Sequence, residues 1–246
     1  MVSGRRRLVS MATTGALGAC CLAAAGCSGG SAAPDPLAGQ TGATVMAEAI
    51  ANLKAAPSVT LSSAGVDSGQ YVNVYISVDP GKGCTGSTTV EILGPWSSEW
   101  ATVTYTTIGQ TVYFKPSSLM WEGLAGANAA TIAQKVNGRY VEDQLSDRNL
   151  QGLGNCLVDG LRVPAGGVTK GQATMLNGVR SLPLTDARGN VIYVTDTSKP
   201  QVIQENIAPV PGTTDPAGET TFTYGGPLKL TPPPAGQVVS GASIHV

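Results

Sequence analysis

The sequence predicts an α+β fold, with one long curved antiparallel β-sheet and a few helices gathered on one face of it. Three observations lead to this class. Residues 44–56 carry apolar side chains at helical spacing. Most of the later chain alternates apolar and polar residues with the period of two that is typical of half-buried strands. The turns between these runs are short, and short turns can join antiparallel strands but not parallel ones.

The first half of the domain reads as one helix followed by a strand meander. Thr44 is the expected N-cap of the helix and Pro57 its stop. The clearest strand is 71–79, where Val72, Val74, Ile76 and Val78 alternate with polar or aromatic residues. The remaining predicted strands here are 58–63, 88–93 and a hairpin over 100–116 that turns near Gly109 and Gln110.

A helical insert then interrupts the strands before they resume. Residues 126–138 have helical spacing, and residues 148–161 form a weaker, glycine-interrupted second helix. The turn at 187–190 predicts another hairpin. The later predicted strands are 177–186, 191–197, 201–207, 220–226 and 227–231, and the prolines at 232–234 begin an extended C-terminal tail over 232–246.

Residues 1–26 have the pattern of an export signal. Arg5–Arg7 form a cationic head, and Leu8–Gly26 is an uncharged, mostly apolar run that ends in small residues. Its polar and glycine positions distinguish it from a spanning helix, which needs about 20 predominantly apolar residues. We expect the segment to be removed, leaving 27–42 as a flexible tether and 43–231 as the folded domain.

Cys27 directly follows the small residues Ala24–Gly26, and this junction resembles a bacterial lipobox. The resemblance implies that Cys27 carries a thioether-linked diacylglycerol and further acyl chains such as palmitate. The protein would then be anchored on the extracytoplasmic face of the cell membrane, since two acyl chains hold a protein stably. Two alternatives stay open: plain secretion without lipid, and use of Cys20 in a second, shorter lipobox.

Cys84 and Cys156 are the cysteines that remain once Cys20 and Cys21 leave with the signal and Cys27 is acylated. An even pair outside the cytoplasm usually oxidises. We therefore predict a disulfide between them, which would tie the helical insert to the turn at 81–84. Two separate buried thiols are the alternative.

Composition and motifs argue against several classes of activity. The signal holds three of the 15 basic residues and none of the 16 acidic ones, so the mature chain carries about −4 charges and has no basic cluster for nucleic acid. The one histidine, His245, lies next to the C-terminus, which disfavours a Ser-His-Asp triad. Neither a His/Cys cluster nor a calcium-loop pattern is present, so we expect no metal, no cofactor and no enzyme.

Three further features have simple structural interpretations. Residues 65–69, with the Asp-Ser-Gly sequence, fit a turn between strands. Residues 81–86 lack the glycine and hydroxyl positions of a phosphate-binding loop and fit a hairpin loop. The tryptophans at 96, 100 and 121 fit core or sheet-face packing, with a ligand groove as the alternative.

Three segments, 108–115 with Trp121, 176–200 and 222–239, together with the lipobox, resemble the actinobacterial lipoproteins related to LppX and LprG. The resemblance implies a half-barrel similar to that of the LolA and LolB carriers, with an apolar cavity between sheet and helices. It implies an acylated lipid or glycolipid in that cavity. This chain departs from the family in its cysteine pair and in a glycine-rich insert near 151–167.

The sequence therefore favours a lipid-anchored envelope protein that binds or carries an acylated lipid, and we expect it to be a monomer. Its cavity would be lined by inward residues of two strands, namely Val72, Val74, Ile76, Val103 and Tyr105. The alternative function is a ligand-free envelope lipoprotein that acts through protein or polymer interactions.

Overall fold

The computed structural model describes residues 36–67, 70–93, 98–145, 156, 162–209 and 218–244, and every described element lies in one compact unit, Asp35–Val246. The described helices are α1 (Gly42–Lys54), α2 (Ser118–Ala125) and α3 (Ala129–Val136), with 3-10 turns at Gly126–Asn128, Ala235–Gln237 and Gly241–Ser243. The described strands are β1 (Ser58–Asp67), β2 (Gln70–Asp79), β3 (Gly83–Leu93), β4 (Ser98–Ile108), β5 (Thr111–Pro116), β6 (Tyr140–Gln144), β7 (Val168–Lys170), β8 (Thr174–Leu176), β9 (Val179–Asp186), β10 (Val191–Thr195), β11 (Val202–Ile207), β12 (Gly218–Gly225) and β13 (Val238–Ser240).

All of these strands belong to one sheet, which confirms the predicted fold class. The strand order is β13-β6-β5-β4-β3-β2-β1-β12-β11-β10-β9-β7, with β8 paired beside β9. The end strands β13 and β7 do not pair with each other, so the sheet is curved but not closed. Every pair is antiparallel except β13 with β6, which is parallel.

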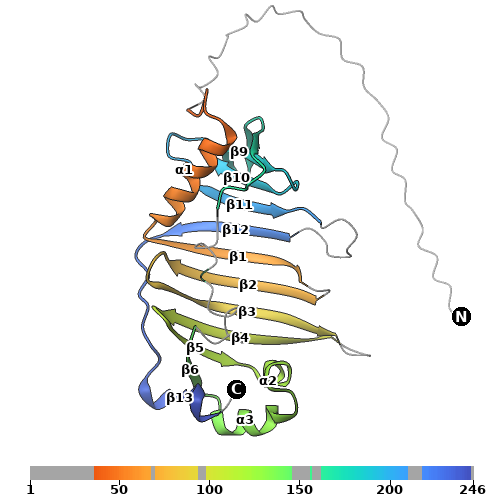
Figure 1. Ribbon diagram of the computed structural model, residues 1–246, viewed down its shortest axis with the longest axis vertical. Helices are drawn as coiled ribbons and strands as arrows, with labels where there is room; N and C mark the ends of the chain where they lie inside the picture. Colours follow the sequence, from red (N-terminus) through yellow and green to blue (C-terminus); the bar gives the residue numbers. More distant parts are fainter. Residues whose placement is uncertain are drawn as a thin grey trace, which may run out of the picture. The chain divides into compact units, whose positions relative to one another are not determined.

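The helices pack at the two ends of the sheet (Figure 1). At one end, α1 contacts β7 and β11, and Asn52 of α1 donates a hydrogen bond to the carbonyl oxygen of Pro200 at 2.8 Å. At the other end, α2 contacts β4 and β5 and packs against α3. All three helices bury side chains in the same apolar core as the strands.

The segment that precedes α1 is part of the folded unit, which corrects the expectation of a flexible tether up to residue 42. Leu37 is fully buried in the core, and the Lys170 Nζ donates to its carbonyl oxygen at 3.0 Å. The N-cap of α1 is Thr41 rather than Thr44, because the Thr41 hydroxyl accepts from the Thr44 amide. The folded unit therefore begins earlier than the helical periodicity predicts.

Helix α2 is an element that the sequence pattern does not predict. Ser117 caps it, since the Ser117 hydroxyl accepts from the backbone amides of Met120 and Thr102. Trp121 is 3% exposed, and its ring centroid lies 6.3 Å from that of Phe114 on β5. This aromatic contact fastens α2 and, through it, α3 to the sheet.

The C-terminal segment also differs from the prediction. Residues 227–231 were predicted as a strand, but they adopt no regular structure. Residues 232–246 were predicted as a tail, whereas β13 extends the sheet beside β6 and Ile244 is buried in the core. A β-strand of three residues has too little periodicity to be detected from sequence alone. His245 lies outside the described residues.

Gly86, in the interior of β3, permits a close approach of neighbouring strands. A Cβ atom at this position would overlap the backbone carbonyl oxygen of Tyr75 and approach the Cα of Ile76, both on β2. A glycine inside a strand commonly marks such an approach or a tight bend. Gly86 is therefore required by the backbone geometry of the central strands.

We predict that Gly86→Ala lowers the free energy of unfolding by about 3 kcal/mol, because the new methyl group must push β2 and β3 apart. Urea unfolding followed by circular dichroism measures the change. Gly123→Ala is the matched control, since the space around Gly123 on α2 is open and alanine is favoured in helices. Equal stability of Gly86→Ala and the wild type would show that the strands tolerate the separation.

Candidate functional site

The register of the sheet determines which residues share a face. Directly paired residues of neighbouring strands point to the same side, and side chains alternate along each strand. One side, here called the apolar face, carries the core residues and receives the helices. One row on this face, here called the core row, runs across seven strands as Phe222, Leu61, Ile76, Gly86, Tyr105, Phe114 and Val141.

All five residues predicted to line a cavity point to the apolar face, as the register shows. Their surroundings nevertheless differ. Ile76, Val103 and Tyr105 are at most 2% exposed and are packed in the core. Val72 and Val74 are half-buried, and Val74 packs against the edge of that core. Burial is therefore tightest at one end of the central strands and decreases toward the other.

Tyr105 and Thr107 are polar side chains within the tightly packed part, each 2% exposed. Burial raises the pKa of Tyr105 to about 12, and hydrogen bonding to Thr88 lowers it by less. Its hydroxyl is therefore uncharged at every physiological pH. Within the core, Tyr105 acts as an apolar ring with a neutral polar tip.

Beside the core row lies a row of mostly polar side chains that includes one valine, here called the mixed row. It consists of Glu205, Thr220, Ser63, Val74 and Thr88, which are paired in that order across β11, β12, β1, β2 and β3. The Thr220 hydroxyl donates to the Ser63 hydroxyl at 3.0 Å. Ile192 on one side and Val103 on the other continue the row into the core.

Glu205 is the ionisable member of the mixed row. A register shift between Tyr193 and Val194 of β10 changes the alternation along β11, so that Glu205 pairs with Ile192 and points to the apolar face. Burial first, and the negative charge of Asp186 second, raise the pKa of Glu205 above its usual value. A carboxyl group on this face is therefore easier to protonate and costly to leave charged.

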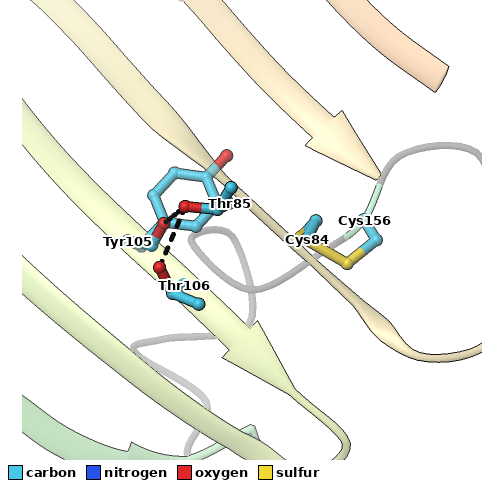
Figure 2. Close-up of a disulfide and its surroundings, with 5 residues drawn as sticks. All are labelled: Cys84, Thr85, Tyr105, Thr106 and Cys156. Carbon is cyan, nitrogen blue, oxygen red and sulfur yellow. Dashed lines mark hydrogen bonds between the residues drawn. A yellow bond between two sulfur atoms is a disulfide. The ribbon is translucent and has the colours of Figure 1, made fainter. Parts of the chain in front are cut away.

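The disulfide predicted from the sequence is present in the structure. Cys84 is fully buried on the apolar face of β3, and it is bonded to Cys156 with a Cα–Cα distance of 5.7 Å (Figure 2). The two cysteines are 72 residues apart. Closing a loop of that length contributes about 4 kcal/mol to stability in the loop-entropy model. Cys156 is thereby fixed over the central strands, which lie between the two groups of helices.

The other predicted site residues fall as follows. Cys27 and the alternative Cys20 lie outside the described residues, as do most of the helical insert at 148–161 and Trp96. Across the described part of the chain, no three His, Cys, Asp or Glu side chains are close enough together to hold a metal ion. The described helices include none that is long and apolar enough to cross a membrane.

Sequence reasoning missed the polar members of the mixed row. Ser63, Thr220 and Glu205 come from segments far apart in the chain, and only the strand pairing brings them beside Val74. Residues 201–207 do not alternate evenly, since Val202 and Ile203 are adjacent, and the sequence alone does not locate the register shift that turns Glu205 inward. What the arrangement offers chemically is a half-buried apolar strip with hydroxyl and carboxyl groups along it.

Comparison with known proteins finds similarity among solved structures. No family model matches the chain, and none of the curated proteins matches it. Among solved structures, the crystal structure of LprF from Mycobacterium bovis is similar to this chain with a TM-score of 0.47 and 11% sequence identity. The similarity covers 78% of this chain and 96% of LprF.

We predict that Glu205→Gln stabilises the folded state at neutral pH, because glutamine replaces a charge that burial disfavours. A folded-state pKa raised above the unfolded value makes stability fall as pH rises through it. The gain should therefore vanish below pH 4.5, the ordinary pKa of a glutamate, where the wild type is also uncharged. Urea unfolding midpoints across the pH range measure the effect.

The matched control for this prediction is Glu122→Gln, on the exposed surface of α2. It should leave the pH dependence of unfolding unchanged. If Glu205→Gln and Glu122→Gln follow the same pH curve as the wild type, the carboxyl of Glu205 is not held in the environment described above.

Proposed function

We propose that the protein is a lipid-anchored extracytoplasmic lipoprotein that binds an acylated lipid along the half-buried part of its apolar face. The observation that carries the proposal is the mixed row with its apolar neighbours. Val72, Val74 and Val90 share one face, are only half-buried, and adjoin a fully packed core. Apolar side chains in this position gain from contact with an acyl chain, at about 25 cal/mol per Å² of surface removed from water.

The polar members of the mixed row suggest which part of a lipid lies there. Ser63 and Thr220 present hydroxyl groups, and Glu205 presents a carboxyl group whose pKa burial raises above its usual value. Small-molecule sites typically combine an apolar lining with a few polar groups that fix orientation. The proposed ligand therefore places its acyl chain against the valines and a hydroxylated head group near Glu205.

Localisation at the membrane is supported by the sequence alone. The cationic head, the apolar run and the small residues before Cys27 make up a lipoprotein signal pattern. A lipid anchor would keep the sheet close to the membrane from which an acylated ligand is drawn. The anchor and the ligand site are separate parts of the proposal and are tested separately.

The ligand part is tested by native mass spectrometry of protein from a lipid-producing host. We expect lipid to co-purify with the wild type and to be lost in Val74→Asp, because the new carboxylate would lie where the acyl chain packs. Asn73→Asp is the matched control, since it adds the same charge on the other face of the same strand and should keep the lipid. Far-UV circular dichroism verifies that both variants fold.

Wild-type protein that is repeatedly free of lipid would contradict this part. It would favour the alternative function, an envelope lipoprotein that acts through protein or polymer contacts. Equal lipid loss in Val74→Asp and Asn73→Asp would also count against it, because the loss would then not depend on the face.

The anchor part is tested by metabolic labelling with an alkyne analogue of palmitate in a bacterium that acylates exported proteins. We expect Cys27→Ser to lose the label and Cys20→Ser to retain it. The reverse pattern would assign the anchor to Cys20. Wild-type protein that is secreted without label would refute lipidation.

A further inference from the structure

A second surface, on the opposite face of the sheet, carries exposed aromatic side chains that the acyl-binding proposal does not use. Tyr71 and Tyr75 on β2 are each 57% exposed, and Trp100 on β4 is 50% exposed. The register places all three on the face away from the core, because they alternate with Val72, Val74 and Ala101. Large aromatic groups kept this exposed on a sheet face commonly mark an interaction surface.

One of these aromatics borders a groove of about 270 Å³. Tyr75 stands at one side of it, and Tyr140 of β6 also lines it. Between them the groove is lined by Ser77, Thr85, Gly86, Thr104, Tyr105 and Thr106. The groove thus combines two phenol rings with a floor made mostly of hydroxyl groups.

The hydrogen bonds of Thr85 and Thr106 determine whether their hydroxyl groups can donate to a ligand or accept from it. The Thr85 hydroxyl donates its hydrogen to the Tyr105 carbonyl oxygen at 3.1 Å (Figure 2). Because a hydroxyl has only one hydrogen, the 2.9 Å bond between Thr85 and Thr106 must be donated by Thr106. Both hydrogens are then used, which leaves only lone pairs of these two hydroxyl groups for a ligand.

The charges in and around the groove further restrict the class of ligand that it can bind. None of the residues that line it carries a carboxylate, amine, guanidinium or imidazole group. The nearby cation Lys115 is engaged, with its Nζ 5.6 Å from the centre of the Tyr140 ring. Across the described residues of β1 to β4 on this face, the charged side chains are Glu91 and Asp79, and Asp79 pairs with Lys82 at 2.9 Å. This surface would not attract an anionic polymer.

We propose that the groove and the aromatic residues beside it bind an uncharged glycan. A sugar ring presents apolar C–H groups that stack on aromatic faces and O–H groups that donate to the lone pairs of the threonine floor. Tyr71 lies four residues from Tyr75 on the same strand, about 13 Å away along it. A chain of several sugars that begins at Tyr75 would extend along β2 to Tyr71 and reach Trp100 on β4.

Isothermal titration calorimetry tests this proposal, with neutral hexasaccharides of glucose, mannose and galactose as probes. The protein is used in the form that the expressing cell produces after processing. We expect at least one of them to bind the wild type and to bind Tyr75→Ala about tenfold more weakly, because one stacking contact is lost. Trp100→Ala should weaken binding as well. An acidic hexasaccharide of uronic acid and glucosamine sulfate should bind less tightly than the neutral probe.

Met175→Ala is the matched control, since Met175 is an exposed apolar residue on β8, outside this face, at 65% exposure. It should bind as the wild type does. The proposal is overturned if no neutral probe binds, if the acidic probe binds better, or if Tyr75→Ala binds like Met175→Ala. A wild-type dimer in sedimentation that Tyr75→Ala dissociates would also overturn it and assign the face to a second copy.

Discussion

The structure depends on one constraint: a single sheet that does not close has an apolar face that must be removed from water. The described strands alone cannot do this, because they all lie in one layer. The chain covers the two ends of the face with its helices and joins Cys156 to Cys84 over the middle. Leu37 and Ile244, from opposite ends of the folded unit, complete the same core.

The cover is uneven along the strands, and this gives the face its chemical character. Around Ile76 and Tyr105 the packing is close, whereas around Val72 and Val74 it is incomplete. Tyr105 and Thr107 are polar groups within the closely packed part, but polar side chains predominate in the mixed row, where Val74 and Ser63 are only half-buried. Burial there is sufficient to raise the pKa of Glu205 but leaves the valines half-buried. The proposed lipid site is the consequence of this gradient.

Much of the fold can be predicted from the sequence because period-two alternation is strong in β2, β4 and β9 and because the turn at 109–110 is short. The disulfide could be predicted because removal of the signal leaves one even pair. Local patterns fail where a short element is held by distant contacts. Helix α2 is eight residues long and is fastened through Trp121, and β13 is three residues long and is held by β6. Leu37 gives no periodic signal at all.

The site could be predicted only in part, for a physical reason. Alternation shows which residues of one strand share a face, so the five predicted residues share the face expected of them. It does not show how tightly each is covered, and Ile76, Val103 and Tyr105 are packed rather than open. Nor does it fix which strands pair, and a shift of one residue would move every side chain to the other face. Glu205 joins the mixed row through such a shift.

The most direct measurement of the central claim is an NMR experiment with carbon-13-labelled palmitate and methyl-labelled valine. The account predicts nuclear Overhauser contacts between the acyl methylenes and the methyl groups of Val72, Val74 and Val90. Contacts confined to side chains of the opposite face, such as Tyr71 and Tyr75, or no contacts with a saturating amount of palmitate, would contradict it.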